Sequence, residues 1–197
     1  MVYDDRNRST SHEVPERNRR MPGVQISSLI ADVPDFPQPG IVFKDITPLI
    51  RSSSGFAEAV SQLVAAAPRD ADVVVGMEAR GFIFGAPVAL ALGLGFVPVR
   101  KPSKLPRATL TASYDLEYGT ETLAVHADAI TPGSRVLIVD DVLATGGTIA
   151  ATADLMAQLG ADVAGVAVVV ELGFLSGRQF LARRGISQVT SLCVAEV

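Results

Sequence analysis

Residues 136–148 read Val-Leu-Ile-Val-Asp-Asp-Val-Leu-Ala-Thr-Gly-Gly-Thr, and they are the most informative part of this sequence. Four apolar residues predict a short buried strand, and the helical pattern after Thr148 predicts a helix that begins beside the Thr-Gly-Gly-Thr turn. Strand, loop and helix N-terminus in this order are typical of open α/β sheets, whose ligands gather at the carboxyl ends of the strands. The unpaired N–H groups of a helix N-terminus favour a phosphate.

Two acids, Asp140 and Asp141, lie beside this anion site, so their repulsion with an anion must be relieved. Ligand hydroxyls that donate to the carboxylates, with Mg²⁺ nearby, would relieve it. Ribose 5-phosphate has this layout, with a phosphate at one end and a diol at the other. The loop lacks the Gly-Lys-Ser/Thr of a Walker A motif and the Gly-x-Gly-x-x-Gly of a dinucleotide site. The stretch therefore predicts a ribose 5-phosphate site.

Working outward, short apolar strands alternate with helical patterns, which predicts an open, mainly parallel twisted α/β sheet flanked by helices. Residues 101–113 break this rhythm with two prolines and three cations. Residues 1–20 are polar and highly charged, and we expect a disordered tail before a single domain at 21–197. The expected strands are 72–76, 96–99, 120–127, 135–139, 163–170 and 189–194, and the expected helices are 24–33, 56–67, 81–92, 147–159 and 174–184.

The composition of the 197 residues excludes several classes of protein. A net charge of −4 argues against a generic nucleic-acid binder. No apolar run approaches the roughly 20 residues of a membrane span, so no membrane partner is expected. A single cysteine, Cys193, allows no intramolecular disulfide and fits a reducing compartment. We therefore expect a cytoplasmic protein.

The thirteen residues 136–148 resemble the signature of the type I phosphoribosyltransferases. The resemblance implies that family's fold with a flexible catalytic loop, Mg²⁺ that arrives with phosphoribosyl pyrophosphate, and a homodimer. It implies that Asp140 and Asp141 face the ribose hydroxyls; neither is assigned as a direct metal ligand, although they are the candidates. The 5-phosphate would be held by Ala144, Thr145, Gly146, Gly147 and Thr148.

Four further segments, 35–48, 76–85, 99–106 and 114–119, resemble the branch of this family that acts on adenine. With the signature, the resemblance covers roughly residues 25–195. It implies an enzyme of purine salvage that transfers the 5-phosphoribosyl group to adenine and gives AMP and pyrophosphate. Its small-molecule partners would be adenine and phosphoribosyl pyrophosphate.

These segments supply the other half of the expected site. Phe43 can stack on a purine, although its pattern also fits a core residue. Arg80 can pair with pyrophosphate oxygens in a bidentate manner. By resemblance, Arg80 and Glu117 are catalytic, Glu117 as the acid/base near the purine, and residues 103–113 form a lid. The other residues so implied are Val42 and Lys44 for adenine, Glu78, Ala79, Arg100, Lys101 and Lys104 with Arg80 for pyrophosphate, and Tyr118 for support of the lid.

Two alternatives stay open. The base could be xanthine, hypoxanthine, guanine or orotate, although no Lys follows soon after Thr148 to serve a 6-oxo group. The fold could also serve a regulator that senses an effector and carries a nucleic-acid-binding module. The acidic body and the absence of a helical recognition pattern in residues 1–20 argue against that regulator.

Overall fold

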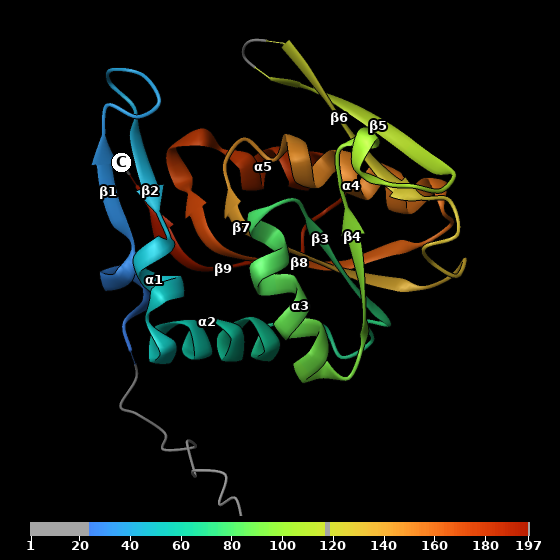
Figure 1. Cartoon of the computed structure of the whole chain (residues 1–197), viewed down its shortest axis with the longest axis horizontal. Coiled ribbons are helices and arrows are strands. Elements are labelled where there is room, and N and C mark those ends of the chain that lie inside the picture. Colours follow the sequence, from blue (N-terminus) through green and yellow to red (C-terminus); the bar gives the residue numbers. More distant parts are fainter. Residues whose placement is uncertain (1–23, 117–118, 197) are drawn as a thin grey trace, which may run out of the picture.

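The computed structural model describes residues 24–116 and 119–196. The predicted tail, Glu117 and Tyr118 lie outside the described residues. The main sheet has five parallel strands in the order β4-β3-β7-β8-β9, so the chain reverses its direction of travel across the sheet between β4 and β7 (Figure 1). These strands are β3 (Val73–Met77), β4 (Gly95–Val99), β7 (Arg135–Leu143), β8 (Asp162–Leu172) and β9 (Val189–Ala195).

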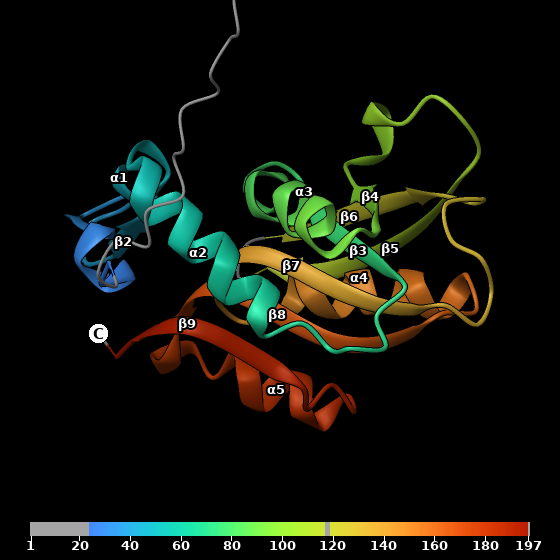
Figure 2. The ribbon, with the colours of Figure 1, turned by 90° about the horizontal axis from the view of Figure 1, so that it is seen from below.

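Helices cover both faces of this sheet (Figure 2). On one face lie α2 (Ser53–Ala65) and α3 (Arg80–Leu92), joined to the short α1 (Thr47–Arg51). On the other lie α4 (Gly147–Gln158) and α5 (Gly177–Arg183). Successive side chains of a strand point to opposite faces, and β7 follows this rule: Leu137 packs toward α3, and Ile138 packs toward α4. None of the helices in the described ranges is long and apolar enough to cross a membrane.

Two antiparallel hairpins lie outside the main sheet. The first joins β1 (Ala31–Pro34) to β2 (Val42–Asp45) at one end of the molecule (Figure 1). The second joins β5 (Thr109–Leu116) to β6 (Gly119–His126) and packs on α4. Three 3₁₀ turns complete the described chain: η1 (Ile26–Leu29), η2 (Pro102–Lys104) and η3 (Gly173–Leu175).

The predicted α/β class, the parallel sheet and all six expected strands are confirmed, and the main differences from the prediction lie in three segments. The expected helix at 24–33 is only the turn η1, because the chain then pairs with β2 as β1. Residues 101–113 show no clear pattern in the sequence, yet they form strand β5 from Thr109, where Leu110 and Ala112 face the core in period two. The lid role of residues 103–113 stays a prediction. The strand expected at 135–139 runs on to Leu143, so both aspartates belong to β7 itself.

Candidate active site

The loop after β7 closes around a small cavity of about 50 Å³ lined by residues 142–149. Gly146 adopts a φ of 87°, which non-glycine residues rarely tolerate, and α4 begins at the next residue. The first N–H groups of α4 therefore face the same loop as the Thr145 and Thr148 side chains. The five residues predicted to hold the 5-phosphate, 144–148, all line this one cavity.

The acids of the predicted ribose site are buried at the end of β7. Asp140 is 9% exposed and Asp141 is 4% exposed. Burial, and then the charge of Asp141, raise the pKa of Asp140 well above its usual range. Burial also raises the pKa of Asp141, while the nearby guanidinium of Arg80 opposes this shift. Adjacent carboxylates in such surroundings attract any ligand that brings hydroxyl donors or a cation.

Arg80, the first residue of α3, links the two halves of the expected site. Its Nε lies 2.6 Å from Asp141 Oδ2, a close ion pair without hydrogen-bond geometry. Its guanidinium also lies 5.5 Å from the ring centroid of Phe43, within cation–π range. Phe43 is half-buried on the β1–β2 hairpin and belongs to neither hydrophobic core, so its alternative assignment as a core residue was wrong.

Val42 and Lys44 flank Phe43 on strand β2. Lys44 directs its Nζ to Asp32 Oδ1 of β1 at 2.8 Å. Val42 is 38% exposed and pairs with Pro34 in the hairpin register. The ring of Phe36 meets Phe43 edge-on, with centroids 5.3 Å apart.

The cations predicted for pyrophosphate gather beyond the ends of β3 and β4. Arg100 Nε donates to Glu78 Oε2 at 2.8 Å, and the peptide bond between Glu78 and Ala79 is cis. Arg100 also donates to the carbonyl of Lys104 at 3.3 Å, which holds the exposed Lys104 turn beside it. Lys101 Nζ lies 3.3 Å from Glu121 Oε1. The structure thus brings Glu78 and Arg100 together, and it places Lys101 against the β5–β6 hairpin.

One contact of the loop was missed by sequence reasoning. The Thr148 hydroxyl donates to the Tyr114 hydroxyl at 3.2 Å, and Tyr114 donates in turn to Glu121 Oε2 at 3.1 Å. Tyr114 follows Leu110 and Ala112 in the inward period of β5, and that alternation was the signal available. A strand reading of 109–116 would have placed Tyr114 against the core, but not on Thr148. The predicted roles of Glu117 and Tyr118 concern residues outside those described.

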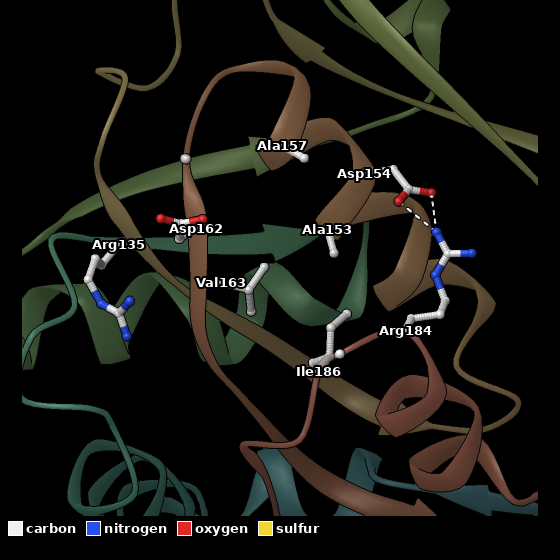
Figure 3. A pocket seen from close by; sticks show the side chains of 10 residues that line it. Arg135, Ala153, Asp154, Ala157, Asp162, Val163, Arg184 and Ile186 are labelled. Carbon is white, nitrogen blue, oxygen red and sulfur yellow. Dashed lines mark hydrogen bonds and ion pairs between the residues drawn. The ribbon is translucent and has the colours of Figure 1, made fainter.

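A larger hollow, of about 550 Å³, lies between α4, the beginning of β8 and the end of α5 (Figure 3). It lies at the opposite edge of the sheet, because Arg135 and Asp162 in its wall begin β7 and β8. Its arginines already have acidic partners: Arg184 Nη2 lies 2.6 Å from Asp154 Oδ1, and Arg135 Nε lies 2.8 Å from Asp70 Oδ2. We assign it no ligand.

The fold and the loop after β7 are those of a phosphoribosyltransferase. A sequence model of the phosphoribosyl transferase domain matches residues 44–188. An adenine phosphoribosyltransferase of Cutibacterium acnes is 62% identical over 167 residues, which cover 85% of this chain and 94% of that protein.

Solved structures agree with this assignment. A crystal structure of adenine phosphoribosyltransferase from Thermoanaerobacter pseudethanolicus has a TM-score of 0.82 and 49% identity, and covers 86% of this chain and 98% of its own. The Saccharomyces cerevisiae enzyme, complexed with an imino-altritol bisphosphate and adenine, has a TM-score of 0.78 and 41% identity, with 85% and 96% covered. The chain belongs to the adenine phosphoribosyltransferase family.

Proposed function

We propose that this chain transfers the 5-phosphoribosyl group of phosphoribosyl pyrophosphate to adenine, giving AMP and pyrophosphate in purine salvage. The observation that carries the proposal is the pair Asp140 and Asp141, buried beside a loop cavity at a helix N-terminus. Family membership supports the base, because curated relatives 54–64% identical to this chain are named adenine phosphoribosyltransferases.

The proposed reaction forms one bond and breaks one at the same carbon. Adenine N9 attacks C1 of the ribose, and the bond from C1 to the pyrophosphate oxygen breaks with its electron pair leaving on pyrophosphate. Charge of oxocarbenium type develops on the ribose ring, as in glycosidic chemistry generally. The protein has to hold two substrates in line and stabilise the leaving group.

Each part of the site has a proposed role in that step. Residues 144–148 hold the 5-phosphate, and Asp140 and Asp141 accept hydrogen bonds from the ribose hydroxyls. Arg80 and the cations Arg100, Lys101 and Lys104 neutralise pyrophosphate, with Glu78 and Ala79 in the adjoining turn. Phe43 stacks on adenine, and the backbone of Val42 and Lys44 reads its edge. Glu117 acts as the acid/base that accepts or donates the proton of the purine, and Tyr118 supports the lid.

Arg80 has to change partners for this assignment to hold. It lies against both Asp141 and Phe43, which are the proposed ribose and base contacts. When substrates bind, the ribose hydroxyls donate to the Asp141 carboxylate, and the purine stacks on the Phe43 ring. The guanidinium is then free to move to the pyrophosphate, whose charge is greater.

Mg²⁺ is the proposed cofactor, and it would stabilise the charge of the departing pyrophosphate. Within residues 24–116 and 119–196, no group of three His, Cys, Asp or Glu side chains could hold a metal. The buried Asp140 and Asp141 nevertheless fit a nearby cation, because both have raised pKa values and Asp141 Oδ2 lacks a hydrogen bond among the described residues. A metal that already carries oxygen ligands from the substrate suits such a site.

We also propose a cytoplasmic homodimer. Its interface would be the outer side of α3, where Ile83 is 36% exposed and Leu90 is 83% exposed on the same helix face. Apolar side chains this exposed on one helix commonly mark an interface. Light scattering of the wild type and of Leu90→Glu tests this interface. The wild type should be dimeric, and the variant should be shifted toward the monomer. A wild-type protein that is monomeric like the variant would contradict the proposal.

The base is tested by a panel of adenine, hypoxanthine, guanine, xanthine and orotate with phosphoribosyl pyrophosphate and Mg²⁺. We expect nucleotide from adenine alone. Product from another purine but not from adenine would contradict the assignment. Tight binding of phosphoribosyl pyrophosphate without product from any base would favour the effector sensor instead.

A second experiment tests the proposed proton transfer. Glu117→Ala should lower kcat at saturating substrates more than it weakens binding of phosphoribosyl pyrophosphate. General acid–base catalysis typically contributes about 100-fold or more, so the loss should be of that order. Unchanged turnover would remove Glu117 from the mechanism.

A further inference from the structure

The wall behind the 5-phosphate loop is built by a segment that the proposed mechanism does not use. In the sheet register Leu143, the last residue of β7, lies beside Glu171 on β8. The chain leaves β8 at Leu172, passes through η3 and enters α5 at Gly177. The beginning of α5 therefore returns to the place where β7 ends and the loop begins.

A side-chain network fixes the beginning of α5 to this edge of the sheet. Arg178 Nε donates to Glu171 Oε1 at 2.9 Å, and Arg178 Nη2 contacts Glu171 Oε2, so the pair is bidentate. Arg178 Nη2 also donates to Ser191 Oγ at 3.0 Å, and Ser191 donates to Glu171 Oε2 at 2.7 Å. Arg178 Nη1 donates to the carbonyl of Val189. One guanidinium thus joins β8, α5 and β9.

The first turn of α5 touches the loop itself. A Cβ on Gly177 would lie 2.1 Å from the carbonyl oxygen of Ala144, so the two backbones are in direct contact. A Cβ on Gly146 would meet the Gly177 carbonyl and the Phe180 ring at 3.1 Å each. The loop thus has no room on this side, and its shape follows the position of α5. A shift of α5 would move Ala144 and Gly146 together.

We propose that Glu171 and Arg178 are positioning residues for phosphoribosyl pyrophosphate, acting through Gly177 on the loop that holds its 5-phosphate. Glu171 is 6% exposed and shares its bonds between Arg178 and Ser191, so the network is rigid. Neither side chain lines the loop cavity. The inference rests on the proposed function of residues 144–148 as the phosphate site.

Arg178→Gln tests it, with Arg184→Gln as the matched control. Arg184 lies just past the other end of α5, and its Nη2 donates to both carboxylate oxygens of Asp154 of α4, at 2.6 and 2.8 Å (Figure 3). Arg178→Gln should weaken binding of ribose 5-phosphate, measured by calorimetry, about tenfold, as small misplacements of binding groups do. Arg184→Gln removes an arginine of the same segment away from the loop, and its affinity should stay within about twofold.

Steady-state kinetics separate positioning from general loss of structure. In Arg178→Gln the KM for phosphoribosyl pyrophosphate should rise about tenfold, while the KM for adenine and kcat at saturation stay within about threefold. Equal rises of both KM values would overturn the proposal, and so would wild-type affinity for ribose 5-phosphate. Equal weakening in Arg184→Gln would overturn it too.

Milder variants keep the test decisive should Arg178→Gln fail to fold. Arg178→Lys keeps the charge without the fork, and Ser191→Ala removes one hydrogen bond to Glu171. We expect graded weakening of ribose 5-phosphate binding, larger for Arg178→Lys; wild-type affinity in both would overturn the proposal. Wild-type binding of ribose 5-phosphate uses no base, so it stands apart from the base panel that tests the proposed reaction.

Discussion

Buried acids lie on two neighbouring strands at the carboxyl ends of the sheet, and their pKa values are shifted in opposite directions. Asp140 and Asp141 near the end of β7 have raised pKa values, because burial dominates and few donors reach them. Glu171 near the end of β8 is also little exposed to solvent, at 6%, yet hydrogen bonds from Arg178 lower its pKa. Solvent exposure is low in both groups, so the opposite shifts come from the partners of Glu171 together with a weaker effect of burial there.

The comparison distinguishes the proposed ribose site from a structural contact. The fork of Arg178 and the hydroxyl of Ser191 satisfy the Glu171 carboxylate within the protein. Asp140 accepts only the N–H of Asp141, at 2.9 Å, from among the described residues, and Asp141 faces Arg80 in a contact that we propose the substrates replace. Carboxylates held in unfavourable surroundings are typical of functional sites, because the missing partner is the ligand.

The sharpest test of this difference makes the same chemical change on both strands. The double variant Asp140→Asn/Asp141→Asn keeps the shape of both side chains and removes the charges proposed to bind the substrate. Hydrogen bonds to charged groups contribute about 1.5–3 kcal/mol each, so kcat/KM for phosphoribosyl pyrophosphate should fall at least about 100-fold. Steady-state kinetics would measure this fall. Glu171→Gln, compared alongside, should lower it only about tenfold through the loop; equal losses would erase the distinction.

Stability should respond in the reverse order. Glu171→Gln leaves Arg178 without its carboxylate, and removing one partner of a buried pair is strongly destabilising. Because the Arg178 side chain is 42% exposed, water compensates in part, and we expect a loss of about 1–3 kcal/mol in the free energy of unfolding by urea. Asp154→Asn, which breaks an exposed pair at the other end of α5, should cost less than about 1 kcal/mol. Equal costs would mean that Glu171 is not a structural carboxylate.

A smaller change in stability, of opposite sign, is expected at the proposed ribose site. The raised pKa of Asp140 means that the folded chain binds this proton more tightly than the unfolded chain, so ionised Asp140 lowers stability at neutral pH. Asp140→Asn should therefore raise the Tm of the free protein, by about 2–4 °C for each kcal/mol gained. Thermal melts between pH 8 and about pH 4 would measure the gain. An unchanged or lower Tm at pH 8 would show that Asp140 is not held unfavourably.

The pH dependence distinguishes the two carboxylates further. The gain in Tm of Asp140→Asn should shrink as the pH falls toward 3.8, the pKa of Asp140 in the unfolded chain, because wild-type Asp140 is then protonated. Glu171 has a lowered pKa, so its contribution is present above 4.5 and is lost only as the pH falls through the folded value. The Glu171→Gln deficit should stay constant from pH 8 to about pH 5.

The two regions also differ in how well the sequence predicted them. Residues 136–148 are contiguous, so strand, acids, glycines and helix could be read together, and in the structure residues 142–148 of this stretch line one cavity directly after the two acids. Glu171 and Ser191 meet only because β8 and β9 pair, and Arg178 reaches both from α5. A single sequence carries no sign of which distant side chains will meet. The strand at 109–116 was missed for a local reason: Pro106 and three cations hid its alternation.

The smallest expected effect on activity concerns Thr148. This residue belongs to the loop, but its hydroxyl already has a hydrogen-bond partner within the protein. Burial raises the pKa of Tyr114, so its hydroxyl stays protonated, accepts from Thr148 and donates to Glu121. The Tyr114 ring packs against Gly147, since a Cβ on Gly147 would lie 3.0 Å from it. Tyr114→Phe keeps this ring and removes only the hydroxyl.

One neutral hydrogen bond contributes about 0.5–1.5 kcal/mol, so kcat/KM for phosphoribosyl pyrophosphate should fall about threefold in Tyr114→Phe. Thr122→Val is the matched control, since it removes the 2.9 Å contact with Ser113 on the same hairpin, away from the loop, and should leave kcat/KM unchanged. A fall would place Tyr114 with Arg178, among residues that shape the loop before the ligand arrives. A rise would mean that Tyr114 competes with the phosphate for the Thr148 proton, and Thr148 would then belong with the aspartates, whose partner is the ligand.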